Sequence, residues 1–375
     1  MDDRDLLLRL RLARARGVGP RAVLLLRELL GSLDPLLEAS PGDLEARGVP
    51  PRILHALADP ALARRGQAEL ARVRALGATL LGAGLPGYPE ALLALHDPPV
   101  TLSVRGAITP DDARAVAIVG ARRATPAGVE VARALAADLA HAGVTVVSGL
   151  ARGVDRAAHE GALAAGGRTI AVLGSGVANP YPAQHAGLAE RIAQAGAVVS
   201  ELEPDAAPSR HTFPQRNRIV AALSLGVVVV EAGPRSGALI TADLGMQLGR
   251  ELFAVPGSVL EPLSRGPNRL LREGAHLVES AADVLDVLFG VGLRDDGLGA
   301  LLCERTEDDA PPAPAGLDAV SARVLGALTV REPRPLERVA AATTLGVDDV
   351  MTALGRLELA GRVRASVAGY VKVGA

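Results

Sequence analysis

Between residues 111 and 290 the sequence alternates short apolar segments with longer amphipathic segments. The apolar segments are dominated by aliphatic residues, which is typical of strands buried on both faces. This alternation predicts an α/β fold in which helices cover both faces of a parallel sheet. The expected strands are residues 115–119, 144–148, 169–173, 197–201, 227–231 and 251–255, and the expected helices lie near residues 126–141, 153–165, 183–195, 215–224 and 237–249.

The charge balance of the chain limits where an anion could bind. The 375 residues include 40 Lys and Arg against 42 Asp and Glu, a formal net charge of -2. A chain without a global basic field can bind anions only where positive charge is concentrated locally. Apart from Lys372 the cationic side chains are arginines, so any single arginine is a weak indication of a site.

The cysteine content and the first residues indicate a compartment. Cys303 is the one cysteine, which permits no internal disulfide and no cysteine-based zinc site and suits a reducing compartment. The first ten residues, MDDRDLLLRL, are acidic where a signal peptide is basic, and no apolar run approaches a membrane span. We expect a cytoplasmic protein with no membrane partner.

The segments that precede the sheet have a different pattern. Residues 1–75 have helical spacing throughout and predict a small helical domain, with Gly17 and Gly19 between two helices. Such a hairpin can aim backbone N–H groups at a DNA phosphate, or it can simply turn the chain between packed helices. The second interpretation is slightly favoured. Residues 76–110 are predicted to connect this domain to the sheet through one or two strands.

The segments that follow the sheet suggest a linker and a further domain. Residues 291–316 are acidic and rich in Pro and Ala, as in a flexible linker. Residues 317–375 fit three helices and a hairpin, the order found in a winged helix. The helix expected at 347–360 would be its recognition helix, but it carries three acidic residues against Arg356, a poor composition for phosphate binding. A packing or partner role is favoured for it.

The loops after the first and second strands have the composition of anion sites, because ligands bind beyond the carboxyl ends of such sheets. After the first strand, Gly120 permits a tight turn, and Arg122 and Arg123 offer planar donors for phosphate oxygens. After the second strand come Ser148, Gly149 and Arg152. For Arg122 and Arg123 the alternative is that they are only solvated surface residues.

Two side chains of the helix after the second strand could form an acid–base pair. Asp155 and His159 are four residues apart and therefore lie on the same helix face. A structural role is favoured, since an acidic residue near a helix N-terminus is stabilised by the helix dipole.

The loops after the later strands add an aromatic ring to the same edge. A third glycine-rich turn contains Gly174, with Tyr181 nearby for packing or stacking. Residues 211–218, HTFPQRNR, bring Phe213 and a group of polar side chains to a helix start, a combination that single-stranded nucleic acid uses for phosphate contacts and base stacking. The alternative is that Phe213 fills the core. Ser236 and Gly237 form a further strand-to-helix turn.

Six segments in this order resemble the DNA-processing protein A (DprA/Smf) family. The resemblance covers roughly residues 75–280, and the flanking domains agree with the arrangement of that family. The segments are VGARRAT (119–125), VSGLARGVDRAAHEGAL (147–163), GRTIAVLGSGV with NPYP (167–182), FPQRNRIVAALS (213–224), VVVEAGPRSGALITA (228–242) and FAVPGS (253–258).

The resemblance implies a non-enzymatic, cytoplasmic protein that needs no cofactor. It implies a homodimer that binds single-stranded DNA and loads the recombinase RecA during natural transformation. The expected architecture is an extended Rossmann-like sheet, flanked by an N-terminal helix-hairpin-helix or SAM-like domain and a C-terminal winged-helix-like domain. Arg122 corresponds to a principal DNA contact of the family, and Arg152, Arg216 and Arg218 correspond to pocket residues. The full set of expected DNA-binding residues is Gly120, Arg122, Arg123, Thr125, Ser148, Gly149, Arg152, Gly174, Phe213, Gln215, Arg216, Asn217, Arg218, Ser236 and Gly237.

The chain departs from the family pattern in two respects. Ala121 stands where the family usually has Ser or Thr, which removes one hydroxyl donor. Arginines stand where the family often carries lysines, so phosphate would be held by bidentate donors instead of point charges.

Two other functions remain open from the sequence. Rossmann-like enzymes of the lysine-decarboxylase-like group hydrolyse nucleoside monophosphates at a PGGxGTxxE loop, and residues 231–242 occupy the corresponding position. The final Glu of that motif falls on Thr241, although Glu231 could substitute for it. A DNA-protection module without a recombinase partner would share all of these residues.

Overall fold

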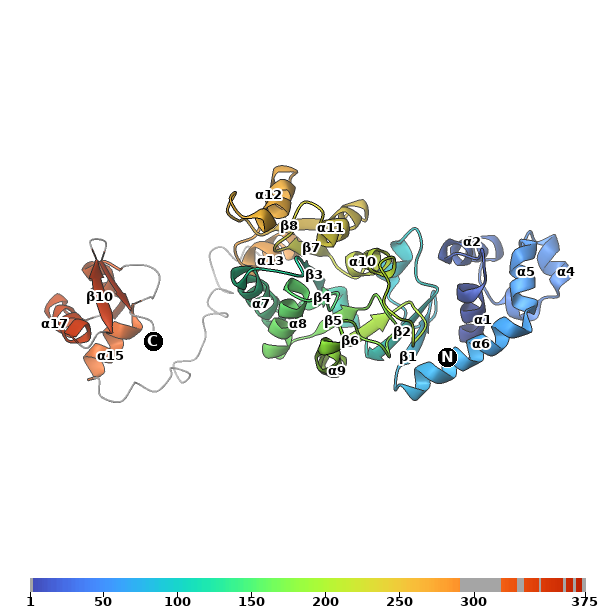
Figure 1. The fold of residues 1–375 in the computed structure, drawn as a ribbon, viewed down its shortest axis with the longest axis horizontal. Coiled ribbons are helices and arrows are strands. Elements are labelled where there is room, and N and C mark those ends of the chain that lie inside the picture. The colour runs from blue at the N-terminus through green and yellow to red at the C-terminus, as the bar shows by residue number, and fades with distance from the viewer. Residues whose placement is uncertain are drawn as a thin grey trace. The chain divides into compact units, whose positions relative to one another are not determined.

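The computed structural model describes residues 3–290, 318–328, 334–343, 345–359, 362–366 and 369–372. It divides into two compact units, Met1–Arg294 and Asp295–Ala375 (Figure 1). The linker predicted at residues 291–316 lies outside the described residues.

The first unit is built on a sheet that is mostly parallel, as the sequence predicts. Within the described residues its strand order is β1-β2-β6-β5-β4-β3-β7-β8-β9. β1 pairs with β2 and β2 with β6 in antiparallel fashion, and the other neighbours are parallel. The strands are β1 (Thr79–Gly82), β2 (Thr101–Gly106), β3 (Ala115–Val119), β4 (Thr145–Ser148), β5 (Thr169–Val172), β6 (Ala197–Ser200), β7 (Gly226–Val229), β8 (Glu251–Ala254) and β9 (His276–Leu277).

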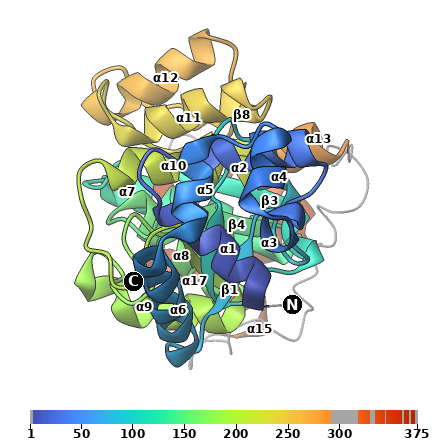
Figure 2. The same cartoon turned by 90° about the vertical axis from the view of Figure 1, so that its right-hand side faces the viewer.

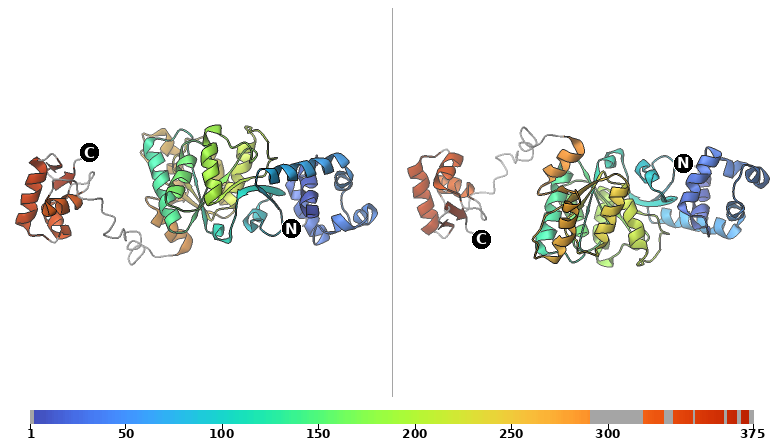
Figure 3. Two further views of the ribbon diagram at one scale, coloured as in Figure 1. Left: turned by 90° about the horizontal axis from the view of Figure 1, so that it is seen from below. Right: turned by 90° about the horizontal axis from the view of Figure 1, so that it is seen from above.

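Helices cover both faces of this sheet because successive strand residues point to opposite faces. Ala117 and Val119 of β3 pack in the cluster that includes α10, α11 and α12, whereas Val116 and Ile118 pack in the one that includes α7, α8 and α13. Figure 3 shows the two layers in turn, green helices nearest the viewer from below and yellow helices from above. The helices are α7 (Pro126–His141), α8 (Val154–Ala164), α9 (Ala186–Ala195), α10 (Thr212–Ala222), α11 (Gly237–Gln247), α12 (Arg265–Arg272) and α13 (Ala281–Phe289), with short 3-10 turns at η1 (Glu90–Ala94), η2 (Pro110–Ala113), η3 (Ala183–His185) and η4 (Pro262–Ser264).

The strand and helix pattern predicted between 111 and 255 is confirmed, with ends that differ by at most a few residues. The helix predicted at 215–224 begins earlier, at Thr212, so that Phe213 lies in its first turn. Strand β9 and helices α12 and α13 were not predicted, because β9 is only two residues long and the segment between 256 and 264 interrupts the alternation.

The N-terminal helices gather at the β1 side of the sheet (Figure 2). Each helix after the first starts with a proline, whose fixed φ and missing N–H suit the first helical position. Gly17 has a φ of 73° and precedes α2, as a tight connection requires. The helices are α1 (Asp3–Arg14), α2 (Pro20–Leu30), α3 (Pro35–Glu38), α4 (Pro41–Ala46), α5 (Pro51–Ala58) and α6 (Pro60–Ala75).

Among its described residues the second unit has three helices and a β-hairpin, as predicted for a winged helix. Val324, Val339, Leu354 and Leu357 form its core. Arg356, the cation of the last helix, makes an ion pair of 3.1 Å with Asp318. The elements are α15 (Ala319–Gly326), α16 (Leu336–Thr343), α17 (Val347–Leu359), β10 (Val363–Ser366) and β11 (Gly369–Lys372). In the part of the chain that the structure describes, no helix is long and apolar enough to cross a membrane.

Candidate nucleic-acid interface

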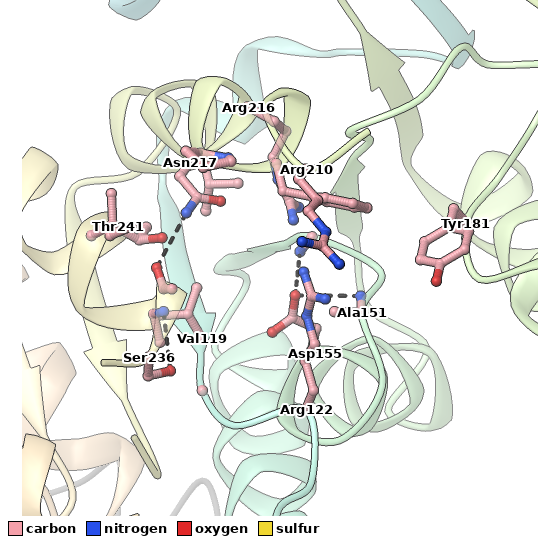
Figure 4. A pocket seen from close by; sticks show the side chains of 18 residues that line it. Val119, Arg122, Ala151, Asp155, Tyr181, Arg210, Arg216, Asn217, Ser236 and Thr241 are labelled. Atoms are coloured by element: carbon pink, nitrogen blue, oxygen red, sulfur yellow. Dashed lines mark hydrogen bonds between the residues drawn. The ribbon is translucent and has the colours of Figure 1, made fainter. Parts of the chain in front are cut away.

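The carboxyl ends of β3 and β4 open into a cavity of about 570 Å³, which we call the main cavity (Figure 4). The strand order runs from β3 toward β6 in one direction and toward β9 in the other, and ligands bind at such a reversal in open α/β sheets. The lining residues are Val119, Gly120, Arg122, Gly149, Ala151, Asp155, Tyr181, Arg210, Phe213, Pro214, Arg216, Asn217, Val220, Ser236, Gly237, Ala238, Ile240 and Thr241.

Arg122 reaches the main cavity from the turn after β3. A side chain at Gly120 would begin 2.5 Å from Cγ2 of Val154, so the turn can pass this close to α8 only with glycine. Arg122 itself is exposed, and its guanidinium carbon lies 4.9 Å from the centre of the Phe213 ring. This cation–π contact holds a positive charge beside an aromatic face.

Phe213 is half-buried and packs while also facing the main cavity. A Cβ on Gly174 would lie 2.7 Å from Cδ1 of Phe213, so the ring packs directly on that glycine. The hydroxyl of Thr212 donates to the carbonyl of Gly174 at 2.5 Å and fixes the start of α10. The Tyr181 ring lies 5.7 Å from the Phe213 ring, tilted by 53°. The two rings form an aromatic corner beside Arg122.

Arg216 contributes a buried positive charge to the wall of the main cavity near Phe213. Only 5% of the residue is exposed, and its Nη1 donates to the carbonyl of Val172 at 2.7 Å. Its Nε has no hydrogen-bond partner, and no ion pair of Arg216 occurs within the described ranges. Burial lowers the pKa of Arg216, and the negative charge of Asp155 opposes that shift. An anion in the cavity would compensate a charge that the protein itself pairs incompletely.

Asp155 lies below the loop of residues 149–153, which follows β4. Its Oδ2 accepts from the backbone N–H groups of Gly149 at 3.2 Å and Ala151 at 3.4 Å. Burial raises the pKa of Asp155, whereas the charge of Arg216 lowers it. The carboxyl group therefore orders the loop at the cavity floor.

The same loop is held at Leu150, whose φ of 57° is unusual for a residue other than glycine. The Leu150 N–H donates to Nε2 of His159 at 3.3 Å, and Nδ1 of His185 donates to the Leu150 carbonyl at 2.9 Å. Nδ1 of His159 donates to the hydroxyl of Thr169 at 2.7 Å, since that hydroxyl itself donates to Val146. Burial lowers the pKa of His159 to about 3, so the ring is neutral. The favoured structural interpretation of Asp155 and His159 agrees with these contacts.

The opposite wall comes from α10 and α11. Nδ2 of Asn217 donates to the carbonyl of Gly237 at 3.2 Å, which joins the middle of α10 to the start of α11. The hydroxyl of Ser236 accepts from the N–H of Ala238 at 3.3 Å and caps α11. Figure 4 shows Arg122, Arg210 and Arg216 converging on one part of the cavity, with Asn217 and Ser236 on the other side.

Three of the expected DNA-binding residues have well-defined contacts within the protein. The hydroxyl of Thr125 caps α7 and bonds to the carboxylate of Glu231 at 2.5 Å, and the buried hydroxyl of Ser148 donates to the carbonyl of Ile118 at 2.7 Å. Arg218 is buried and makes ion pairs with Glu201 at 2.6 Å and with Asp97 at 3.1 Å. None of the three lines the main cavity, and each supports the fold through these contacts, so their DNA-binding role stays a prediction.

Four other expected residues do not line the main cavity: Arg123, Arg152, Gly174 and Gln215. Gly174 supports Phe213 from below. Arg123 is exposed on the turn after β3. Gln215 lines a small cavity of about 160 Å³ beside Arg14 of α1, and Arg152 lines a separate cavity of about 500 Å³. The residues that the structure does bring together in the main cavity are Gly120, Arg122, Gly149, Phe213, Arg216, Asn217, Ser236 and Gly237.

Sequence reasoning missed one cation and most of the apolar lining. Arg210 stands in the irregular loop before α10, where its position just ahead of Thr212 and Phe213 was the available signal. Tyr181 was noted for packing or stacking but not included in the site. Among the described residues no group of three His, Cys, Asp or Glu side chains is placed to hold a metal ion.

Fold and site together define an open α/β protein whose cationic, aromatic cavity lies at the carboxyl edge of a Rossmann-like sheet. Two family models match the sequence, DNA recombination-mediator protein A over residues 79–289 and the DprA winged helix domain over residues 308–369. The chain belongs to the DNA recombination-mediator protein A (DprA/Smf) family, as the resemblance suggested.

Individual relatives agree with this assignment. The chain is 40% identical to the Smf protein of Escherichia coli over 289 residues, which cover 76% of this chain and 75% of that protein. The X-ray structure of DNA processing protein A from Streptococcus pneumoniae matches with a TM-score of 0.62 and 34% identity, over 74% of this chain and 96% of that one. A structure of DNA processing protein A from Helicobacter pylori, reported with its single-stranded DNA binding mode, matches with a TM-score of 0.52 and 33% identity, over 57% and 96%.

Proposed function

We propose that the main cavity binds single-stranded DNA. The observation that carries the proposal is the convergence of Arg122, Arg210 and Arg216 beside the ring of Phe213. Cationic groups neutralise phosphates, and an aromatic ring offers a stacking surface to any base. The Helicobacter pylori relative is described with a single-stranded DNA binding mode, and that precedent supports the assignment.

The geometry favours single strands over duplex. The bases of a duplex are stacked on each other, so they cannot stack on a ring in the wall of a cavity unless the duplex opens. The half-buried Phe213, with Gly174 behind it and Tyr181 beside it, is a surface for an unstacked base.

On the basis of the family, the wider role is that of a recombination mediator. The protein protects incoming single-stranded DNA and loads RecA onto it during natural transformation, acting as a cytoplasmic homodimer without enzymatic activity. A test of loading is the rate at which RecA assembles on oligonucleotides coated with single-strand-binding protein. An unchanged rate in the presence of this protein would leave a DNA-protection role without loading.

Hydrolysis of nucleoside monophosphates is the less favoured function. The carboxylate of Glu231, the candidate acid–base group, accepts from the N–H of Thr125 at 2.8 Å and from its hydroxyl, and it does not line the main cavity. Thr241 does line the cavity but cannot transfer protons as a carboxylate does. Release of free base from AMP and other monophosphates measures this directly, and clear turnover would refute the binding-protein assignment.

The central experiment compares labelled oligo-dT with a duplex of equal length over a series of salt concentrations. We expect tighter binding of oligo-dT, with an affinity that falls as salt rises because phosphate contacts release counterions. Arg122→Ala should weaken binding and reduce the magnitude of the salt slope by about 0.7, the contribution of one phosphate on a single strand. Arg272→Ala, which removes an exposed arginine of α12 outside the main cavity, is the matched control. Equal affinity and slope in wild type and Arg122→Ala would remove Arg122 from the site.

A further inference from the structure

We propose a second phosphate-binding site, next to the main cavity and separate from it, which extends the path of single-stranded DNA across α8 and α9. This second cavity has a volume of about 500 Å³, and Arg152, Arg156 and Arg191 are among the residues that line it. The inference rests on the proposed function, because its ligand is the same strand that the main cavity holds.

One loop forms the boundary between the two cavities. Ala151 lines the main cavity and Arg152 lines the second, and the Cα atoms of consecutive residues are only about 3.8 Å apart. The loop also packs on the Arg122 turn, since a Cβ on Gly153 would lie 3.0 Å from the backbone of Arg122 and closer still to Ala121. A DNA strand bound at Arg122 therefore reaches Arg152 after crossing a single loop of the protein.

The loop holds its shape before any ligand arrives. Both backbone polar groups of Leu150 are bonded to buried histidines, and the N–H groups of Gly149 and Ala151 are bonded to Asp155. Binding at either side therefore does not have to order this boundary, which preserves affinity.

The charge of the second cavity suits a polyanion. Its three guanidinium groups stand against one carboxylate, that of Glu160. Arg156 pairs with Glu160 at 2.7 Å, and Arg152 donates to the amide oxygen of Gln184 at 3.0 Å, which leaves its charge uncompensated. Arg191 is exposed and has no hydrogen bond or ion pair within the described residues. Fixed-fork guanidinium donors of this kind bind phosphate oxygens in bidentate fashion.

The two sites can be separated by the length of the DNA. We would measure binding of oligo-dT of about 4 and about 16 nucleotides to the full chain, because sites for single strands span about that range. The test variant is Arg156→Ala/Arg191→Ala. Arg272→Ala, which removes the same kind of charge from α12, is the control.

The expected loss of affinity depends on the length of the oligonucleotide. The double variant should bind the short oligonucleotide like wild type but lose about tenfold in affinity for the long one, and its salt slope should fall by about 1.4, at about 0.7 for each of two phosphates. Retained binding of the short oligonucleotide also shows that the variant is folded.

Three outcomes contradict the proposal in distinguishable ways. Unchanged affinity for the long oligonucleotide would mean that the second cavity does not contact DNA. Equal losses for both lengths would mean that it is not a separate site. If wild type binds neither oligonucleotide, the proposed function fails, and this extension fails with it.

Discussion

Gly149→Ala tests how tightly the floor of the main cavity is packed. A Cβ at this position would lie less than 3.0 Å from Cζ, Nη1 and Nη2 of Arg216. Real Cβ atoms essentially never approach so closely, so the guanidinium group or the loop must move. Arg216 is buried and bonded to the carbonyl of Val172, and it cannot withdraw without losing that bond.

The expected loss of stability has two parts. Loss of a hydrogen bond made by a charged group costs about 1.5 to 3 kcal/mol. Forcing an extra methyl group into a packed site costs about 1 to 3 kcal/mol. The free energy of unfolding should therefore fall by about 2.5 to 6 kcal/mol, a large part of the stability of an ordinary domain.

The assay is urea unfolding of the full chain, followed by titration with oligo-dT under native conditions. Gly187→Ala in α9 is the matched control, since a Cβ there meets no atom within 4 Å. That control should be neutral or stabilise the helix by up to about 1 kcal/mol. Gly149→Ala should be less stable and should bind oligo-dT more weakly, because Arg216 no longer occupies its place. If both alanine variants match wild type in stability and affinity, Arg216 is not held as the structure places it, and the reasoning about a fixed buried cation fails.

Two further predictions concern Phe213 and His159. Phe213→Ala should lose about 1 to 3 kcal/mol of affinity for oligo-dT, the usual contribution of a stacked base, but little for an abasic oligonucleotide of equal length. Equal losses for both ligands would show that the ring only supports Arg122. For His159, burial lowers the pKa to about 3 in the native protein, against about 6.5 in the unfolded chain. The unfolded state therefore binds the proton first as pH falls, and stability should drop by up to about 1.4 kcal/mol per pH unit below about 6.5. Denaturant unfolding at pH 7.0 and 5.5 measures this drop, and a drop of the same size in His159→Gln would show that other groups cause it.

The α/β architecture could be predicted from the sequence because its strands are apolar on both faces and alternate with helices of regular length. The turns after β3 and β4 could also be located, since Gly120 and Gly149 mark places where the backbone packs closely. The sequence does not predict which side of α10 each arginine faces, because this depends on how the helix packs against the sheet. Arg216 and Arg218 are two residues apart on that helix and therefore point to nearly opposite sides, one to the cavity and one to Glu201.

Irregular segments limited the prediction of the site in a different way. Arg210 lies in a loop without periodicity, so no pattern gives its direction. Arg152 and Ala151 are neighbours in sequence but face different cavities, which depends on the turn at Leu150. That turn is fixed by His159 and His185, contacts that form only in the folded protein.

The position of β3 between β4 and β7 affects how a ligand would stabilise the protein. The main cavity takes Arg122 from the turn after β3 and Thr241 from α11, so its walls come from both sides of the strand reversal. Neither half of the sheet contains a complete site, and local opening of either half destroys it. Bound single-stranded DNA would therefore stabilise the protein against cooperative unfolding of the whole sheet rather than against fraying of one loop. Stronger protection of the slowly exchanging backbone amides of β3 and β7 after DNA is added is the corresponding signature.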